Sequence, residues 1–265
     1  AQDQNGCRFL QRKFDEGGAA AIDKVFAEVL QHIVELMVDP FGNYLVQKLL
    51  DRCSEQQRLE VLQAVAARGE LVSVALNTHG TRAVQKLIET LSSREQRAIV
   101  IEALRPGVVS LIKDLNGNHV VQRCLQRLGP EDSQFIYDAA CGHCVEVASH
   151  RHGCCVLQRC IDFATPGQKT RLVEEIARNA LSLSQDAFGN YVVQYVLELG
   201  HREACAAVLR SLAGHFCELA MQKFSSNVVE RCLKLGGMVS RPAVAVGRWL
   251  AGWMAGCVLE EGEHG

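Results

Sequence analysis

One short pattern of small, apolar and polar residues recurs along the chain. A glycine is followed by two variable residues, two apolar residues and a glutamine, as in the GNHVVQ segment at 117–122. Copies lie within 5–14, 41–50, 79–88, 116–125, 152–161 and 188–197, and 224–233 holds a variant with serine and glutamate at the glycine and glutamine positions. Successive copies are 36, 38, 37, 36, 36 and 36 residues apart. A period in this range is typical of repeat proteins.

The segments between the copies are predicted to be helical. Their apolar residues follow the 3.6-residue spacing of a helix, for example Leu172, Val173, Ile176 and Leu181. We expect each unit to be a pair of helices, in which the motif helix starts at the Asp, Asn or His next to the glycine. Such units must stack to bury their apolar faces. The pattern predicts an all-α, curved α-solenoid with one concave face, forming one continuous domain over residues 1–265.

The motif helix has two distinct arcs. We number its slots from the residue after the glycine. At 100° per residue, the first, second, fifth (glutamine) and sixth slots share one arc, which we expect to be exposed. The third, fourth, seventh and eighth slots form the opposite arc, which is expected to be core; in one unit it holds Val120, Val121, Cys124 and Leu125.

Composition and charge agree with a helical, globular protein. The chain is 48% hydrophobic and 22% charged, with five Pro and only 6% aromatic residues, which favours helices over a β-sandwich. The formal net charge of −2 excludes a global basic excess of the kind that binds nucleic acid through its phosphates. The sixth slots carry cations in six of seven units and so predict a local basic stripe: Arg12, Lys48, Lys86, Arg123, Arg159 and Arg231, with Tyr195 as the exception.

The twelve cysteines are expected to be reduced thiols in a cytoplasmic protein, because the N-terminus shows no apolar signal segment. Cys124, Cys160 and Cys232 take the seventh slot and should be packing residues.

A zinc site is the competing interpretation of the cysteines. Cysteines and histidines crowd residues 141–160 and include one CxxC spacing. Cys154 and Cys155 fall on slots expected to be exposed and Cys160 on a core slot, and no second ligand pair follows, so we predict no metal and no cofactor.

The apolar run from Trp249 to Leu259 is too short to cross a bilayer, which needs about 20 residues.

The exposed arc points to unpaired bases as ligands. Asn and Gln occupy the first and fifth slots together in three units, and Tyr, His or Arg often takes the second slot. An amide offers both a donor and an acceptor to the pairing edge of a base, and a flat side chain can stack on its face.

These motifs resemble the repeats of the Pumilio (PUF) family of RNA-binding proteins, from Asn5 to about Leu235. The resemblance implies a right-handed superhelix that reads single-stranded RNA one base per repeat, antiparallel to the chain. It assigns base-edge contacts to the first and fifth slots: Cys7, Gln11, Asn43, Gln47, Thr81, Gln85, Asn118, Gln122, Cys154, Gln158, Asn190, Gln194, Ser226 and Glu230. It assigns base stacking to the second slots: Arg8, Tyr44, Arg82, His119, Cys155, Tyr191 and Asn227. Cys155 departs from the family, where arginine is common in that unit.

In the last motif, Glu230 replaces the glutamine of the fifth slot, and this exchange allows the resemblance to be tested chemically. Glu230 only accepts hydrogen bonds, and guanine alone offers adjacent N–H donors on its pairing edge, so Ser226 with Glu230 should select G. The Asn/Gln pairs resemble uracil readers and the Cys/Gln pairs adenine readers, so the expected sequence is 5′-GUAU(A)UA-3′. The parenthesis marks Thr81 with Gln85, where threonine replaces the usual small residue.

The family usually has eight repeats, but residues 236–265, including Trp249 and Trp253, contain no eighth motif. We expect this segment to be a substitute or incomplete C-terminal cap, and the first helix of repeat one to be missing before Ala1.

By resemblance, the partners are mRNA 3′ untranslated regions, with protein effectors on the convex face, and the chain acts as a monomer in post-transcriptional repression or mRNA decay. No catalytic motif stands apart from the repeats, so we expect no enzyme. The alternative is a protein-binding scaffold of armadillo or HEAT type.

Overall fold

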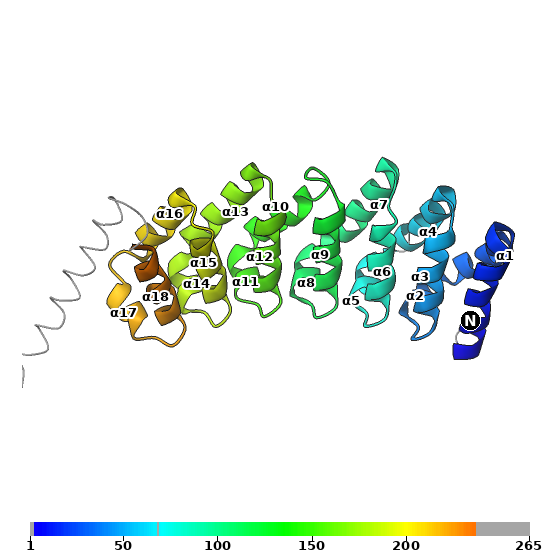
Figure 1. Ribbon diagram of the computed structural model, residues 1–265, viewed down its shortest axis with the longest axis horizontal. Helices are drawn as coiled ribbons and strands as arrows, with labels where there is room; N and C mark the ends of the chain where they lie inside the picture. The colour runs from blue at the N-terminus through cyan, green and yellow to red at the C-terminus, as the bar shows by residue number, and fades with distance from the viewer. Residues whose placement is uncertain (1–2, 68, 237–265) are drawn as a thin grey trace, which may run out of the picture. The chain divides into compact units, whose positions relative to one another are not determined.

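The computed structural model describes residues 3–67 and 69–236, in which helices recur in a fixed order and no strand occurs (Figure 1). They divide into two compact units. The first comprises the described residues of Ala1–His143 with Asp162–Thr165, and the second those of Cys144–Ile161 with Pro166–Gly265. Each unit is treated by itself, and the single domain over 1–265 stays a prediction. The predicted C-terminal cap, with Trp249 and Trp253, lies outside the described residues.

Each complete repeat contains three helices, so the predicted helix pair is wrong. A short helix comes first: α2 (Ile33–Val38), α5 (Leu71–Leu76), α8 (Val108–Lys113), α11 (Cys144–Ala148), α14 (Ala180–Gln185) and α17 (Phe216–Ala220). The motif helix follows: α3 (Gly42–Arg52), α6 (Gly80–Glu89), α9 (Gly117–Arg127), α12 (Gly153–Phe163), α15 (Gly189–Glu198) and α18 (Ser225–Gly236). The third helix is α4 (Glu55–Ala67), α7 (Arg94–Leu104), α10 (Gln134–Gly142), α13 (Pro166–Arg178) or α16 (Arg202–Leu212). A 3₁₀ turn, η1 (Arg105–Gly107), follows α7, and the first motif lies in the long helix α1 (Gln4–Gln31).

The short helices were missed because six residues are less than two turns and show no clear period. The apolar residues Leu172, Val173, Ile176 and Leu181, whose spacing predicts a single helical segment, are divided between α13 and α14. The equivalent break between α4 and α5 contains Gly69, which takes a positive φ of 66° that suits glycine.

A side chain three residues before the glycine caps the motif helix. Asp39 Oδ1 accepts hydrogen bonds from the backbone N–H groups of Phe41 (2.9 Å) and Gly42 (2.6 Å). Such a side chain satisfies N–H groups that a helix start leaves unpaired. The helix thus begins at the predicted place, but the residue next to the glycine is not the capping side chain. The equivalent acceptors are Asp3, Asn77, Asp114 and Asp186, with His150 Nδ1 in the fifth repeat.

The glycine itself is required by close packing against the short helix. A Cβ atom at Gly42 would lie 2.8 Å from the carbonyl oxygen of Leu36, and one at Gly80 would lie 2.4 Å from that of Val74. Such distances are shorter than a real Cβ contact allows. In the last repeat, Ser225 takes this place, and its hydroxyl donates to the equivalent carbonyl, that of Leu219, at 2.8 Å. The serine variant therefore keeps the approach by replacing a steric fit with a hydrogen bond.

The predicted core arc is confirmed. Val120, Val121, Cys124 and Leu125 are all buried, as are Cys160 and Cys232. Burial raises the pKa of the Cys124 thiol to about 12, which fits a neutral packing residue. The exposed exceptions are Phe9 and Lys13 in the first motif and Leu233 in the last.

Motif helices pack side by side within each unit. In the first unit α3 contacts α1 and α6, and α6 contacts α9; in the second, α15 contacts α18. Third helices form a second row, with α4 against α7 and α13 against α16. Consecutive motif helices thus present equivalent slots to the same side of their unit.

Gly80→Ala should lower the free energy of unfolding by about 1–3 kcal/mol, because the added methyl group overpacks the contact with the Val74 carbonyl. Urea unfolding followed by circular dichroism measures this change. Gly142→Ala is the matched control, because an added Cβ there meets nothing within 4 Å. Equal stability of the two variants would contradict the assigned role of the glycine.

Candidate nucleic-acid interface

The second slots form an exposed row, as predicted. Arg8, Tyr44, Arg82, His119, Cys155, Tyr191 and Asn227 are all exposed. The aromatic rings are accessible despite their size, with Tyr44 48% and Tyr191 56% exposed. In the first unit, Arg82 Nη1 donates to Tyr44 Oη at 2.9 Å, so second slots of adjacent repeats are in contact.

Six of the seven first slots are buried, which corrects the predicted exposure of this position. Asn43 is only 1% exposed, and its Nδ2 donates to the carbonyl oxygens of Asp39 and Pro40, both at 2.9 Å. The side chain therefore folds back over the turn before its own helix. Asn118 and Asn190 are also buried and make the same pair of bonds to their own turns.

The buried asparagine holds the glutamine of the fifth slot. Gln47 Nε2 donates to Asn43 Oδ1 at 3.0 Å, and Gln122 and Gln194 donate to Asn118 and Asn190 at 2.8 and 2.9 Å. The six fifth-slot glutamines are half-buried. Because one N–H of the amide is fixed, the glutamine retains its carbonyl oxygen and a second N–H for a ligand. The two slots act as one unit, with the inner residue orienting the outer one.

The two cysteine repeats place a small apolar thiol at the first slot. Cys7 and Cys154 are buried, so the expected exposure of Cys154 is wrong, whereas Cys155 is exposed. Burial raises the pKa of the Cys154 thiol to about 12. This slot therefore carries no charge at neutral pH.

The last motif differs in both slots. Ser226 is half-buried and donates to the Lys223 carbonyl at 3.3 Å, and Glu230 is exposed. A hydrogen bond from Lys234 lowers the pKa of the Glu230 carboxyl group, which is thus ionised at neutral pH. The fifth slot of this repeat offers acceptors only.

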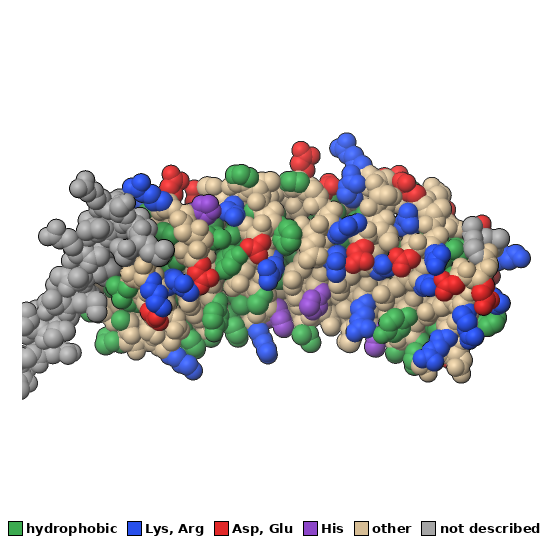
Figure 2. All heavy atoms as spheres, in the orientation of Figure 1, with side chains coloured by type: hydrophobic (Ala, Val, Ile, Leu, Met, Phe, Trp, Pro, Cys, Tyr) green, Lys and Arg blue, Asp and Glu red, His purple; other side chains and the backbone are tan. Residues whose placement is uncertain are grey.

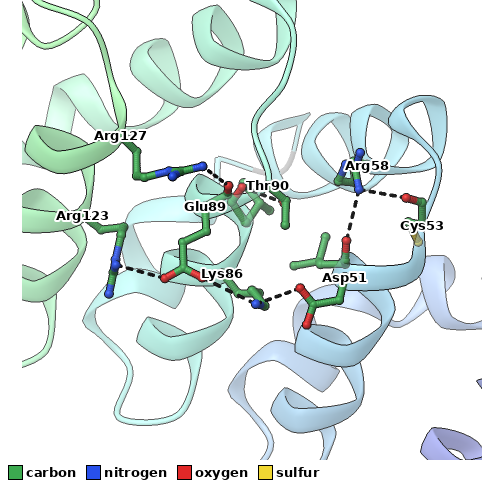
Figure 3. Close-up of polar contacts among 10 residues, drawn as sticks. Asp51, Cys53, Arg58, Lys86, Glu89, Thr90, Arg123 and Arg127 are labelled. Carbon is green, nitrogen blue, oxygen red and sulfur yellow. Dashed lines mark hydrogen bonds and ion pairs between the residues drawn. The ribbon is translucent and has the colours of Figure 1, made fainter. Parts of the chain in front are cut away.

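The predicted basic stripe is largely neutralised by ion pairs between neighbouring repeats. Lys86 Nζ lies 2.8 Å from Asp51 Oδ1 of the preceding motif helix, and Arg123 Nη1 lies 3.1 Å from Glu89 Oε1 (Figure 3). Lys48 pairs with Asp15 and Arg231 with Glu198 in the same way. Acidic and basic side chains alternate in a band across the region of α9, α6, α3 and α1 (Figure 2).

The ninth slot supplies the acid of each pair, and the sequence contained this signal. Asp15, Asp51, Glu89 and Glu198 all lie nine residues after the motif glycine. Hydrogen bonding to Asp51 raises the pKa of Lys86, as expected for a cation beside a carboxylate. We call the pairs between sixth and ninth slots the ion-pair ladder.

A hollow opens in the first unit between α3 and α6. It is lined by Gln47, Arg82, Gln85, Lys86 and Glu89. Two fifth-slot glutamines, one second-slot arginine and two residues of the ladder, Lys86 and Glu89, thus meet at a single concavity. This combination of amides and a flat cation fits a planar polar ligand.

Among the residues that the structure describes, no group of three or more His, Cys, Asp or Glu side chains is placed to hold a metal ion. The same residues include no helix with the length and apolar character needed to span a membrane.

The family model of the Pumilio-family RNA binding repeat matches seven segments: 1–30, 32–66, 70–104, 107–139, 143–177, 179–213 and 215–240. The chain belongs to the Pumilio family. Each of the seven segments of this Pumilio chain contains one of the seven predicted motifs, which confirms their number. The six segments from residue 32 onward also begin close to a short helix.

Curated relatives match over about half of the Pumilio chain. "Putative pumilio homolog 7, chloroplastic" from Arabidopsis thaliana is 60% identical over 156 residues, which are 58% of this chain and 24% of that protein. A pumilio domain-containing protein of Schizosaccharomyces pombe is 51% identical over 154 residues, 58% of this chain and 22% of that protein. The matched part spans about a quarter of the length of these relatives.

Solved structures confirm the fold class of this Pumilio chain as an all-α repeat solenoid. The Puf4 RNA-binding domain bound to the HO endonuclease RNA 3′ UTR recognition sequence is similar with a TM-score of 0.84 and 46% identity, covering 92% of this chain and 76% of that one. The yeast Puf5p RNA-binding domain bound to SMX2 RNA gives a TM-score of 0.83 and 35% identity, covering 90% and 68%. The right-handed curvature stays a prediction.

A double-mutant cycle tests the ion-pair ladder. Asp51→Asn combined with Lys86→Met should give a coupling of about 0.2–1 kcal/mol in the free energy of unfolding, because both side chains are partly exposed. The coupling should shrink in 1 M salt. Zero coupling at low salt would show that this pair does not stabilise the stack.

Proposed function

We propose that this chain binds single-stranded RNA in a sequence-specific manner, with one base for each repeat. The observation that supports this most directly is the recurring triplet on the motif helices. A buried first slot orients a half-buried fifth slot, and an exposed second slot lies one residue from the first. The triplet presents an amide edge beside a flat or polar side chain, which suits the edge and face of an unpaired base. Duplex bases would hide the edges on which this readout depends.

The Asn/Gln repeats are proposed to read uracil. With Gln47 Nε2 held by Asn43, the amide presents a carbonyl oxygen and one N–H. Uracil offers an N–H beside a carbonyl oxygen on its pairing edge, so the two edges are complementary. The same argument applies to Gln122 and Gln194.

The remaining repeats differ in the chemistry that they offer. The ionised carboxylate of Glu230 suits guanine, which alone presents two adjacent N–H donor groups on its pairing edge. The small thiols of Cys7 and Cys154 leave the glutamines to contact adenine. With antiparallel binding, the proposed site is 5′-GUAU(A)UA-3′.

The tyrosine, arginine and histidine side chains of the second slots are proposed to stack on the bases. Stacking of this kind contributes roughly 1–3 kcal/mol per base, which makes tight binding attainable without strong phosphate contacts. Cys155 offers no flat surface, and binding at its repeat should be weaker.

We also propose that the targets are mRNA 3′ untranslated regions and that the outcome is repression of translation or mRNA decay. Support comes from the RNA 3′ UTR recognition sequence bound by the similar Puf4 domain. The proposal includes a monomer in the cytoplasm that binds effectors on its convex face. No catalytic step is part of it.

Exchanging the last pair of base-edge residues should change the preferred base. Ser226→Asn with Glu230→Gln should move the preference at the first nucleotide of the site from G to U, by about tenfold or more, as expected for a bidentate contact. A binding selection with that nucleotide randomised measures the change. Glu203→Gln on α16 is the matched control, because it also removes an exposed carboxylate.

An unchanged preference in the double variant would reject the assigned readout. Equal binding of the unaltered chain to 5′-GUAUAUA-3′ and to a scrambled RNA would favour the armadillo- or HEAT-like protein scaffold.

The ion-pair ladder predicts a weak salt dependence of RNA binding. If all six sixth-slot cations met phosphates, the slope of log affinity against log salt would be roughly −4, because each contact to a single strand contributes about −0.7. Because Lys48, Lys86, Arg123 and Arg231 are paired, we expect a slope clearly shallower than roughly −4. Titrations of 5′-GUAUAUA-3′ at several KCl concentrations measure it.

Asp51→Asn with Glu89→Gln should steepen this slope, because it removes the acidic partners of Lys86 and Arg123. A slope near −4 in the unaltered chain would show that RNA displaces the acids and that the ladder does not shield the cations.

A further inference from the structure

Thr81 lies in the first slot of the third repeat, where three other repeats have asparagine and two have cysteine. The residue is only 5% exposed, and its Oγ1 donates to the carbonyl oxygen of Asn116 at 3.0 Å. A threonine hydroxyl has one proton, and the bond to Asn116 uses it. Toward every other group, Oγ1 of Thr81 can therefore act only as a hydrogen-bond acceptor.

This acceptor holds the amide group of Gln85 in one orientation. Gln85 Nε2 donates to Thr81 Oγ1 at 3.2 Å. If the amide turned over, its carbonyl oxygen would face an oxygen that has no proton to give, and the hydrogen bond would be lost. Gln85 thus keeps Nε2 toward Thr81, and its carbonyl oxygen and second N–H are left for a ligand. The hollow between α3 and α6 is lined by Gln85 but not by Thr81, so of these two side chains a ligand there meets only Gln85.

The asparagine repeats reach the same arrangement by a different route. Asn43 uses its Nδ2 to donate to two carbonyl groups, so the atom that faces Gln47 Nε2 is Oδ1, again an acceptor. The pair of Asn118 with Gln122 is built in the same way. The distance from the glutamine Nε2 to its acceptor is 3.0 Å and 2.8 Å in these two repeats and 3.2 Å in the third repeat. The third repeat thus holds its amide in the same order as the repeats that are proposed to read uracil.

The fifth repeat, which has cysteine in the first slot, lacks this restraint. Cys154 donates its thiol proton to the carbonyl oxygen of Arg151 at 3.3 Å, and within the described part of the chain no hydrogen bond joins Cys154 to Gln158. Sulfur is also a weaker acceptor than oxygen. The amide of Gln158 can therefore turn about its broad terminal torsion. By its hydrogen bonds, Thr81 belongs with the asparagines of this slot and not with Cys154.

The orientation of the amide decides which bases it fits. The pairing edge of uracil has an N–H between two carbonyl oxygens, so it matches a carbonyl beside an N–H in either order. The pairing edge of adenine has one amino group beside one acceptor nitrogen, so it matches a single order. The direction of the RNA fixes the side on which the amino group lies, and a glutamine that turns over can meet it there. A glutamine that is held suits uracil whichever way it is held.

We propose that Thr81 makes the third repeat a reader of uracil, because it holds Gln85 as an asparagine would. Thr81 is then a positioning residue, which acts on the base through Gln85. The inference rests on the proposed RNA binding and replaces the adenine in parentheses, so that the site becomes 5′-GUAUUUA-3′.

The first test varies the fifth nucleotide, which the third repeat reads in the proposed register. Binding titrations of the unaltered chain should show that uracil is preferred over adenine by about fivefold or more, as expected when adenine loses one hydrogen bond. The third nucleotide, opposite Cys154 and Gln158, is the matched comparison within the same chain, and adenine should be preferred there.

A smaller ratio at the fifth nucleotide, or a preference for adenine, would overturn the inference. An equal preference for uracil at the third and fifth nucleotides would remove the contrast with the cysteine repeat and would also count against it. Loss of the preference for guanine at the first nucleotide, opposite Glu230, would instead mean that the proposed function itself fails.

Variants of Thr81 show whether its oxygen is responsible. Thr81→Val keeps the shape but removes the acceptor, so the preference for uracil over adenine should fall below about twofold. Thr81→Ser keeps the oxygen and should retain the preference. Thr81→Cys recreates the pair of Cys154 with Gln158 and should move the preference to adenine. A folded Thr81→Val that retains the unaltered preference would contradict the inference.

Thr81→Val also removes the bond to Asn116, so a control must separate stability from base preference. Asn116→Ala loses the hydrogen bond from Asn116 Nδ2 to the carbonyl oxygen of Leu76, which is 3.0 Å long and joins the same two repeats, but it keeps the backbone carbonyl that Thr81 uses. It should lower the thermal unfolding midpoint and keep the preference for uracil. Loss of that preference in Asn116→Ala would show that stability alone sets it, against the inference. If Thr81→Val does not fold, Thr81→Cys decides, because an unchanged preference for uracil there would overturn the role of the oxygen.

Discussion

The close approach between each short helix and the start of its motif helix is the constraint on which the site depends. Because Gly42 lies against the carbonyl of Leu36, the turn between the helices is tight enough for Asp39 to cap the motif helix. The same turn brings two carbonyl groups within reach of Asn43. The asparagine is thereby fixed, and it fixes Gln47. The steric requirement at Gly42 thus determines, through Asp39 and Asn43, where the amide of Gln47 lies.

The sequence predicted the core and the exposed row of second slots, but not the burial of the first slot. A helical wheel places Val120 and His119 correctly, because their environment is set by the direction of the side chain alone. It fails for Asn118, which lies within the exposed arc but is covered by the turn from the short helix. The short helix was itself invisible, because five or six residues do not establish a period. The wheel describes an isolated helix and carries no information on what packs across its end.

Whether the sixth-slot cations are free or paired could be decided only from the arrangement of neighbouring repeats. When each motif is considered alone, Lys86 and Arg123 predict a basic stripe. The acids Asp51 and Glu89 lie at the far end of the preceding motif helix, about one repeat away in sequence, and only stacking of α3, α6 and α9 brings the pairs together. The ninth-slot pattern was visible in the chain, but its meaning depends on the offset between adjacent helices.

The ladder also gives the array a direction. Each described link joins a cation of one repeat to an acid of the repeat before it, always through the same two slots. A repeat with this pair carries one sign of charge toward its predecessor and the opposite sign toward its successor. Transplanting such a repeat to another place in the array would preserve both contacts, whereas inserting it in reversed order would set like charges against each other. Units that differ in their first, second and fifth slots are thus interchangeable as far as these charges are concerned, provided that each keeps its sixth and ninth slots.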